Sequence, residues 1–86
     1  MLDLNISKGA QKFIHKLHEK QQKQILDKIL LLRLNPYPPS SKQLKNSSYY
    51  SMRSGEYRIL YRLENQVLYI FSVGKRNDSE VYKHPN

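Results

Sequence analysis

The fold is decided by residues 57–73, YRILYRLENQVLYIFSV, in which two runs of branched and aromatic residues flank a short polar break. Both runs, Tyr57–Leu63 and Val67–Val73, have the composition of β-strands. The break, Glu64-Asn65-Gln66, is as short as a hairpin turn. This stretch therefore predicts two adjacent antiparallel strands.

A third run of the same kind, Tyr49–Arg53, precedes them across the short segment Ser54-Gly55-Glu56. The three runs together predict an antiparallel meander. At the start of the chain, Leu2–Ile6 alternates apolar and polar residues, which is typical of a short half-buried strand. We therefore expect a sheet of about four strands.

Between the first strand and the meander, the apolar residues recur at helical spacing. Ser7 can cap a helix that begins near Lys8, and a second helix is expected over about Lys20–Leu34. The proline-rich segment Asn35–Ser41 must end it, because proline lacks an amide proton and restricts the residue before it. The apolar faces are formed by Ala10, Phe13, Ile14 and Leu17 and by Ile25, Ile29 and Leu32. The predicted fold class is α+β, with two N-terminal helices packed on one face of an antiparallel sheet.

The length of 86 residues allows one domain, which we assign to residues 1–86. The absence of cysteine excludes disulfides, thiolate zinc sites and thiol nucleophiles. Met1–Ile6 has neither a basic segment nor a long apolar run, so we expect a cytoplasmic protein with no membrane partner.

Charge is the strongest compositional signal, because 15 Lys and Arg residues against 7 Asp and Glu residues give a net charge of +8. Such an excess predicts binding to a polyanion, most commonly nucleic acid. An acidic protein or an anionic membrane surface are the alternatives. The charge alone predicts binding and not catalysis.

Common catalytic motifs are missing, including a glycine-rich phosphate loop, a GxSxG elbow, an HExxH motif and a carboxylate cluster at metal spacing. His15 and His18 lie three residues apart on the first helix, with no third ligand nearby. We therefore expect no metal and no cofactor. The lysines at every fourth position of this helix form either a solvated face or a binding surface; they are Lys8, Lys12, Lys16 and Lys20.

The meander gathers arginines. Arg58 and Arg62 are expected to share a strand face with Leu60, on a partly apolar, exposed sheet surface. Arg53 lies across a tight turn from Arg58, and Lys75 and Arg76 follow the last strand. Like charges gathered in this way repel one another unless an anion lies between them. For Arg62, a charge that protects a sheet edge is an alternative explanation.

Several segments of the second half resemble the RelE-type toxins of the RelE/ParE superfamily. They are Ser41-Lys42-Gln43-Leu44-Lys45, Tyr57-Arg58-Ile59-Leu60-Tyr61, Ser72-Val73-Gly74-Lys75-Arg76 and Ser79-Glu80-Val81-Tyr82. The tyrosine–arginine segment is shared across the superfamily and indicates the fold. The last two segments favour the RelE branch over the ParE branch.

The resemblance implies a type II toxin that cleaves messenger RNA in the ribosome without a metal and is neutralised by an acidic, RelB-like antitoxin. It assigns Arg58 as the arginine that stabilises the transition state, Arg76 as a second catalytic arginine and Tyr82 as the C-terminal tyrosine. Arg53 falls where the family often has a basic residue. RNA contacts are expected from Lys42, Lys45, Ser51, Arg62 and Lys75.

One position departs from the family, because Ser51 stands where the best-known members carry a catalytic lysine. Arginine stays protonated and cannot act as a general base. Tyr82 or His84 is therefore the candidate base, and a histidine has a suitable intrinsic pKa. Two alternatives to the nuclease stay open: a ParE-like toxin that acts on DNA gyrase, and an RNA- or ribosome-binding module with weakened catalysis.

Overall fold

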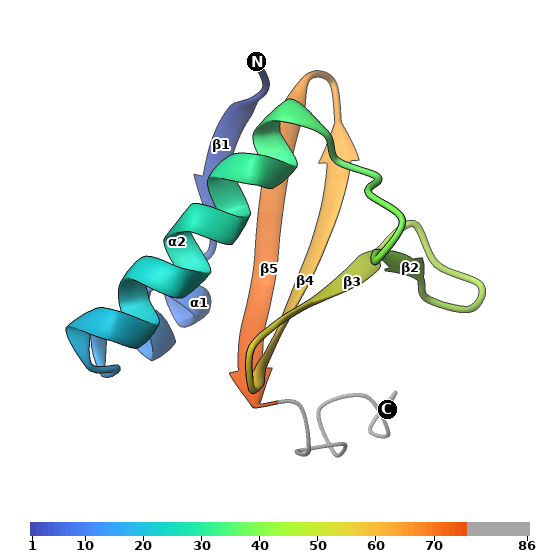
Figure 1. The fold of residues 1–86 in the computed structure, drawn as a ribbon. Coiled ribbons are helices and arrows are strands. Elements are labelled where there is room, and N and C mark those ends of the chain that lie inside the picture. Colours follow the sequence, from blue (N-terminus) through green and yellow to red (C-terminus); the bar gives the residue numbers. More distant parts are fainter. Residues whose placement is uncertain (76–86) are drawn as a thin grey trace.

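A computed structural model describes residues 1–75, which form two helices and one five-stranded sheet (Figure 1). In chain order the elements are β1 (Asp3–Ile6), α1 (Lys8–His15), α2 (Glu19–Leu34), β2 (Lys42–Gln43), β3 (Tyr50–Ser54), β4 (Tyr57–Glu64) and β5 (Val67–Lys75). The predicted α+β class is confirmed.

The sheet has the strand order β1-β5-β4-β3-β2. Strands β3, β4 and β5 form the predicted antiparallel meander. Strand β1 pairs with β5 in parallel, so the sheet is mixed and not purely antiparallel. Two helices separate β1 from the meander. A connection of that length allows parallel pairing, whereas a short turn would force two strands to be antiparallel.

Strand β2 was not predicted from the sequence. It consists of Lys42 and Gln43, which are both exposed, and it pairs with Tyr50 and Ser51 of β3. A two-residue strand without apolar side chains has no alternating pattern to detect. Its pairing comes from the backbone and places Lys42 at the edge of the sheet.

Two tight turns fix the register of the meander. Gly55, between β3 and β4, has a φ of 61°, which is the left-handed region that favours glycine. Asn65 and Gln66, between β4 and β5, have φ angles of 51° and 67°. Positive φ at both central residues is the signature of the type I′ hairpin turn, whose twist matches that of the strands.

Helices α1 and α2 cover one face of the sheet and bury a single core against it (Figure 1). Ser7 caps α1 as predicted, with its Oγ accepting a hydrogen bond of 3.0 Å from the amide of Ala10. The predicted inward stripe of α2 is fully buried, since Ile25, Ile29 and Leu32 are each 0% exposed. The sheet contributes Met52, Tyr57, Ile59, Tyr61, Leu68, Ile70 and Val73 to the same cluster.

The outer side of α2 remains apolar and exposed. Leu26, Leu30, Leu31 and Leu34 are between 39% and 67% exposed. Among the described helices, none is both long and apolar enough to cross a membrane. The exposed leucines extend the apolar surface of α2 beyond its buried stripe.

The sheet face opposite the two helices is called the open face here. One sequence expectation about it is wrong, and it concerns Leu60. Strand β4 pairs with β3 only as far as Tyr61, so Arg62 has a strand neighbour on the β5 side alone, and protection of a sheet edge remains an alternative explanation for its charge. Leu60 is buried, with 6% exposed, because it lies between the stems of Arg58 and Arg62 and opposite Ser51 and Ser72 of the neighbouring strands.

Two adjacent leucines of α2 give a direct test of the core. Leu32→Ala should lower the free energy of unfolding by about 2–5 kcal/mol, because it leaves a cavity in a fully buried position. Leu31→Ala, at a position that is 57% exposed, should change it by less than about 0.5 kcal/mol. Urea denaturation of both variants measures the difference. Equal losses would contradict this arrangement of α2.

Candidate functional site

The open face contains a hollow of about 460 Å³ at the β2–β3 side of the sheet, called the arginine hollow here. It is lined by Ser40, Lys42, Leu44, Ser51, Met52, Arg53 and Arg58. Four of these, Lys42, Ser51, Arg53 and Arg58, were predicted as site residues from the sequence. The hollow therefore brings together residues from β2, β3, β4 and the loops on either side of β2.

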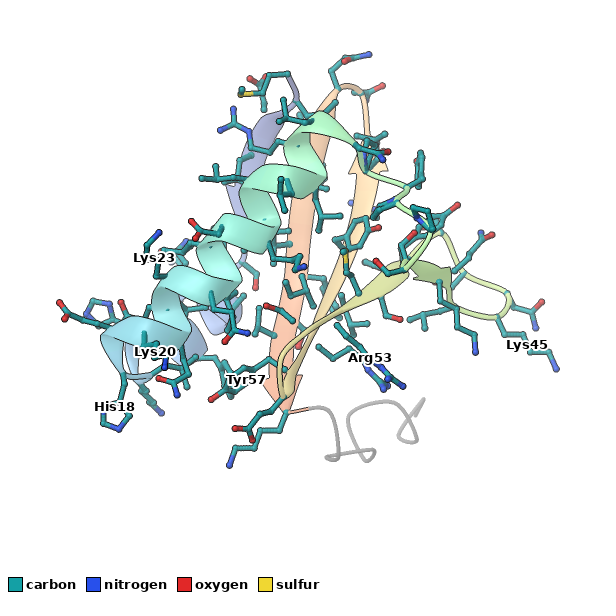
Figure 2. The ribbon with its side chains drawn as sticks, in the orientation of Figure 1. His18, Lys20, Lys23, Lys45, Arg53 and Tyr57 are labelled. Carbon is teal, nitrogen blue, oxygen red and sulfur yellow. The ribbon has the colours of Figure 1, made fainter. Side chains whose placement is uncertain are left out.

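The turn at Gly55 places Arg53 and Arg58 side by side. They are register partners on β3 and β4, as the sequence predicted. Directly opposed residues on one face of an antiparallel pair have their Cβ atoms about 4.5–5.5 Å apart. Arg53 projects away from α2, onto the open face (Figure 2). Two guanidinium groups therefore share one small region of surface.

The short strand β2 adds a third cation. Its Lys42 is the register partner of Ser51, which places both beside the two arginines. The lining holds three basic side chains and two serines, and no acidic residue among the described part of the chain. Guanidinium and ammonium groups with nearby hydroxyls form charge-assisted hydrogen bonds to phosphate oxygens. The chemistry of this hollow is that of an anion site.

Three tyrosines, Tyr37, Tyr50 and Tyr61, form a stack that is called the tyrosine ladder here and that holds the loop before β2 against the core. The Tyr61 hydroxyl donates a hydrogen bond of 2.6 Å to the carbonyl of Pro36. The ring centroid of Tyr50 lies 5.9 Å from that of Tyr61 and 4.9 Å from that of Tyr37. Burial raises the pKa of Tyr61, which keeps its hydroxyl protonated as a donor. The loop that contains Ser40 is thereby held against the sheet.

Arg62 lies outside the arginine hollow. It borders a second, smaller hollow of about 110 Å³, lined by Asn5, Ser7, Tyr49, Arg62, Tyr69, Ile70 and Phe71. An ion pair of 3.1 Å joins Arg62 to Glu64. The aromatic residues of this hollow were not predicted as site residues, although the alternation of Tyr49 with Ser51 and Arg53 indicates that these three share a face.

The other predicted lysines also lie outside the arginine hollow. Lys45 is exposed in the loop between β2 and β3 (Figure 2). Lys75 is exposed at the end of β5, where it is the register partner of Tyr57. The predicted residues Arg76, Tyr82 and His84 lie outside the described residues.

The first helix carries the histidines and lysines that the sequence singled out. Gln11, Lys12, His15 and Lys16 border a shallow, open surface depression of about 340 Å³. Across residues 1–75, no group of three or more His, Cys, Asp or Glu side chains has an arrangement that could hold a metal ion. His18 lies at the junction of α1 and α2, far along the molecule from Arg53 (Figure 2).

Comparison with known proteins gives one family match. The family model described as "ParE toxin of type II toxin-antitoxin system, parDE" matches residues 4–80. No curated protein matches the chain.

Several solved structures share the fold. The isolated E. coli RelE toxin is 26% identical, with a TM-score of 0.78, and the alignment covers 96% of this chain and 93% of that one. The intact E. coli RelBE toxin–antitoxin complex contains a chain that is 25% identical, with a TM-score of 0.74 and coverages of 87% and 96%. The archaeal RelE–RelB complex from Pyrococcus horikoshii OT3 gives 21% identity, a TM-score of 0.79 and coverages of 90% and 97%. At that identity the likeness shows the fold alone.

The tyrosine ladder can be tested by removing one hydroxyl. Tyr61→Phe should lower the free energy of unfolding by about 0.5–1.5 kcal/mol, because it deletes the hydrogen bond to Pro36. Tyr37→Phe, at a half-exposed ring, is the matched control and should leave stability unchanged.

The pKa of Tyr61 gives the same test a pH dependence. The pKa is raised from 10.0 in the folded protein, so the unfolded chain loses this proton more readily. The stabilisation by Tyr61 should be fully present below pH 10 and decline above it, relative to Tyr61→Phe. Thermal unfolding of both proteins across this range measures the effect, and parallel pH curves would contradict it.

Proposed function

The chain belongs to the RelE/ParE superfamily of type II toxins, and from that premise we propose that it cleaves messenger RNA on the ribosome. The observation that carries the proposal is the pairing of Arg53 with Arg58 in a hollow that also contains Lys42. This arrangement favours a phosphate group as ligand. The proposed reaction needs no metal ion.

In the proposed reaction, the 2′-hydroxyl of RNA loses its proton and its oxygen bonds to the adjacent phosphorus. The bond from phosphorus to the 5′-oxygen breaks, and that oxygen takes up a proton. The products are a 2′,3′-cyclic phosphate and a free 5′-hydroxyl. The 2′-hydroxyl confines the reaction to RNA.

The guanidinium groups have the principal role in this mechanism. Negative charge builds up on the phosphorane oxygens in the transition state, and fixed cations stabilise it without reorganising. We assign this role to Arg58 and Arg53, and to Arg76 from the family resemblance. Tyr82 would stack on a base or hold the hydroxyl in line for attack. Lys42 and Ser51 would contact the flanking backbone.

The general base has a different requirement, because it must accept a proton near neutral pH. Arginine does not meet it, and Ser51 lacks the amine that the family's lysine would supply. His84 is the titratable group of the C-terminal segment with a suitable intrinsic pKa. We therefore propose His84 as the base, with Tyr82 as the second candidate.

The second part of the proposal is a cognate acidic antitoxin, similar to RelB. The chain has a net charge of +8, which suits an acidic partner. The exposed leucines of α2 provide apolar surface that a protein partner could cover. Similar toxin chains are found in complexes with RelB.

A ParE-like action on DNA gyrase is the second candidate function. It is favoured by the family model, which describes ParE toxins and spans residues 4–80. The paired arginines speak for the nuclease, because inhibition by binding alone does not require two guanidinium groups in one hollow. Catalytically weakened RNA binding is the remaining alternative, and Ser51 is its basis.

Primer extension on a ribosome-bound message tests the nuclease. The purified protein should create new 5′ ends only where ribosomes are present. Arg58→Ala should slow single-turnover cleavage by roughly 100-fold or more, because a transition-state donor is lost. Arg58→Lys keeps the charge but not the planar fork, and should recover only part of the rate.

The matched control is Lys23→Ala, which removes one positive charge from α2, away from the hollow. It should cleave at the wild-type rate. Inhibition of DNA supercoiling without any new 5′ ends would contradict the nuclease and support the gyrase function.

The base can be tested separately. His84→Gln should slow single-turnover cleavage by roughly 100-fold and flatten its pH dependence between pH 5 and 8. Adding Ser51→Lys to this variant should restore part of the rate, because it supplies an amine beside Arg53 and Arg58. An unchanged rate in His84→Gln would remove the histidine from the mechanism and leave Tyr82 as the candidate.

A further inference from the structure

A second group of side chains on the open face, here called the aromatic platform, consists of Tyr49, Arg62, Tyr69 and Phe71. The Arg62 guanidinium carbon lies 5.1 Å from the ring centroid of Tyr69 and 5.8 Å from that of Tyr49. The ring centroids of Tyr49 and Phe71 are 5.0 Å apart. Phe71 is 54% exposed. Three rings and one planar cation thus form a continuous surface.

An irregularity in the sheet presents Phe71 to solvent. Leu60 pairs with Ser72 and Tyr61 pairs with Ile70, so Phe71 is an extra residue of β5. Bulges of this kind redirect a side chain and are found beside functional sites. An apolar ring that is turned outward, next to two tyrosines and an arginine, has no role in the core cluster.

We propose that the aromatic platform is a second RNA subsite, which stacks one unpaired base of the strand that is cleaved at the arginine hollow. Every base has a π face, and aromatic side chains and arginine planes are the groups on which unpaired bases stack. The inference rests on the proposed function and adds a contact outside the reacting phosphate.

Charge decides between a base and a phosphate as the ligand here. Glu64 already pairs with Arg62 at 3.1 Å, which neutralises the cation and repels a phosphate group. The arginine hollow has the opposite character, with three basic side chains and no acidic residue in its described lining. Asn5, which borders the platform and is the register partner of Tyr69, offers an amide to a base edge.

The distance between Arg58 and Arg62 along β4 is consistent with two separate RNA contacts. Arg58 and Arg62 are four residues apart on β4 and on the same face, which separates them by about 13 Å. That spacing is too long for one nucleotide to contact both sites through its phosphate and its own base at once. The platform would therefore hold a neighbouring nucleotide of the same strand.

The experiment uses a fluorescently labelled hexaribonucleotide and its abasic derivatives, in which one base at a time is removed. Binding to the full-length protein is measured by anisotropy. For the wild type, one abasic position should weaken binding by roughly 5- to 150-fold, the range for loss of one stacked base. In Phe71→Ala and in Tyr49→Ala this dependence should disappear, whereas Phe71→Tyr should retain it.

Two controls separate stacking from other effects. Leu31→Ala removes an exposed apolar side chain from α2 and should bind every oligonucleotide as the wild type does. The dependence of binding on salt should be unchanged in Phe71→Ala, because no phosphate contact is lost. In Arg58→Ala the salt slope should fall by about 0.7, the value for one phosphate contact on a single strand.

The outcomes distinguish this inference from the proposed function. If Phe71→Ala and Tyr49→Ala bind all oligonucleotides as the wild type does, the subsite is overturned, while cleavage at the arginine hollow still stands. If those variants instead lose only neutralisation by the antitoxin, the platform is a protein-docking surface and the inference is again wrong. If the wild type shows the base-dependent binding but no cleavage on ribosomes, the subsite is supported and the nuclease is not.

Discussion

The arginine hollow depends on the cross-strand pairing of Arg53 with Arg58. Like charges directly opposite one another destabilise a sheet, so this pairing has to be imposed by something else. The other face of the same strands imposes it, because Tyr57 and Ile59 are locked in the core and Gly55 allows the tight turn. The core thus holds the two guanidinium groups side by side. An anion that binds there meets two side chains whose positions the fold has already set.

The open face has two chemically distinct ends. Three basic side chains line one end, and aromatic rings around an arginine that pairs with Glu64 form the other. Leu60 is buried between them. A single RNA strand carries both complementary chemistries, a charged backbone and aromatic bases. The hydrogen bond from Tyr61 to Pro36 attaches the loop before β2, at the cationic end, to the core.

Sequence patterns predicted most of the fold because strong local signals govern it. The polar breaks at Gly55 and Asn65 set the hairpins, and the stripe that includes Ile29 set the buried face of α2. The parallel pairing of β1 and the two-residue strand β2 were not predictable, since they depend on long-range backbone contacts. The candidate site was predicted only in part, because some of its contacts are local in the sequence and others are not. Arg53 and Arg58 meet through a local turn, whereas the exposure of Phe71 follows from an irregularity with no sequence signature.

The parallel contact between β1 and β5 has a consequence for biosynthesis. The first strand of the chain hydrogen-bonds to the last described strand, and β5 lies between β1 and β4. Until translation has passed Val73, the growing polypeptide lacks the strand that joins its two halves, and its helices have an incomplete surface to pack on. Contacts of such long sequence separation close late and slowly. Newly made protein would therefore acquire its complete sheet only after β5 has left the ribosomal exit tunnel.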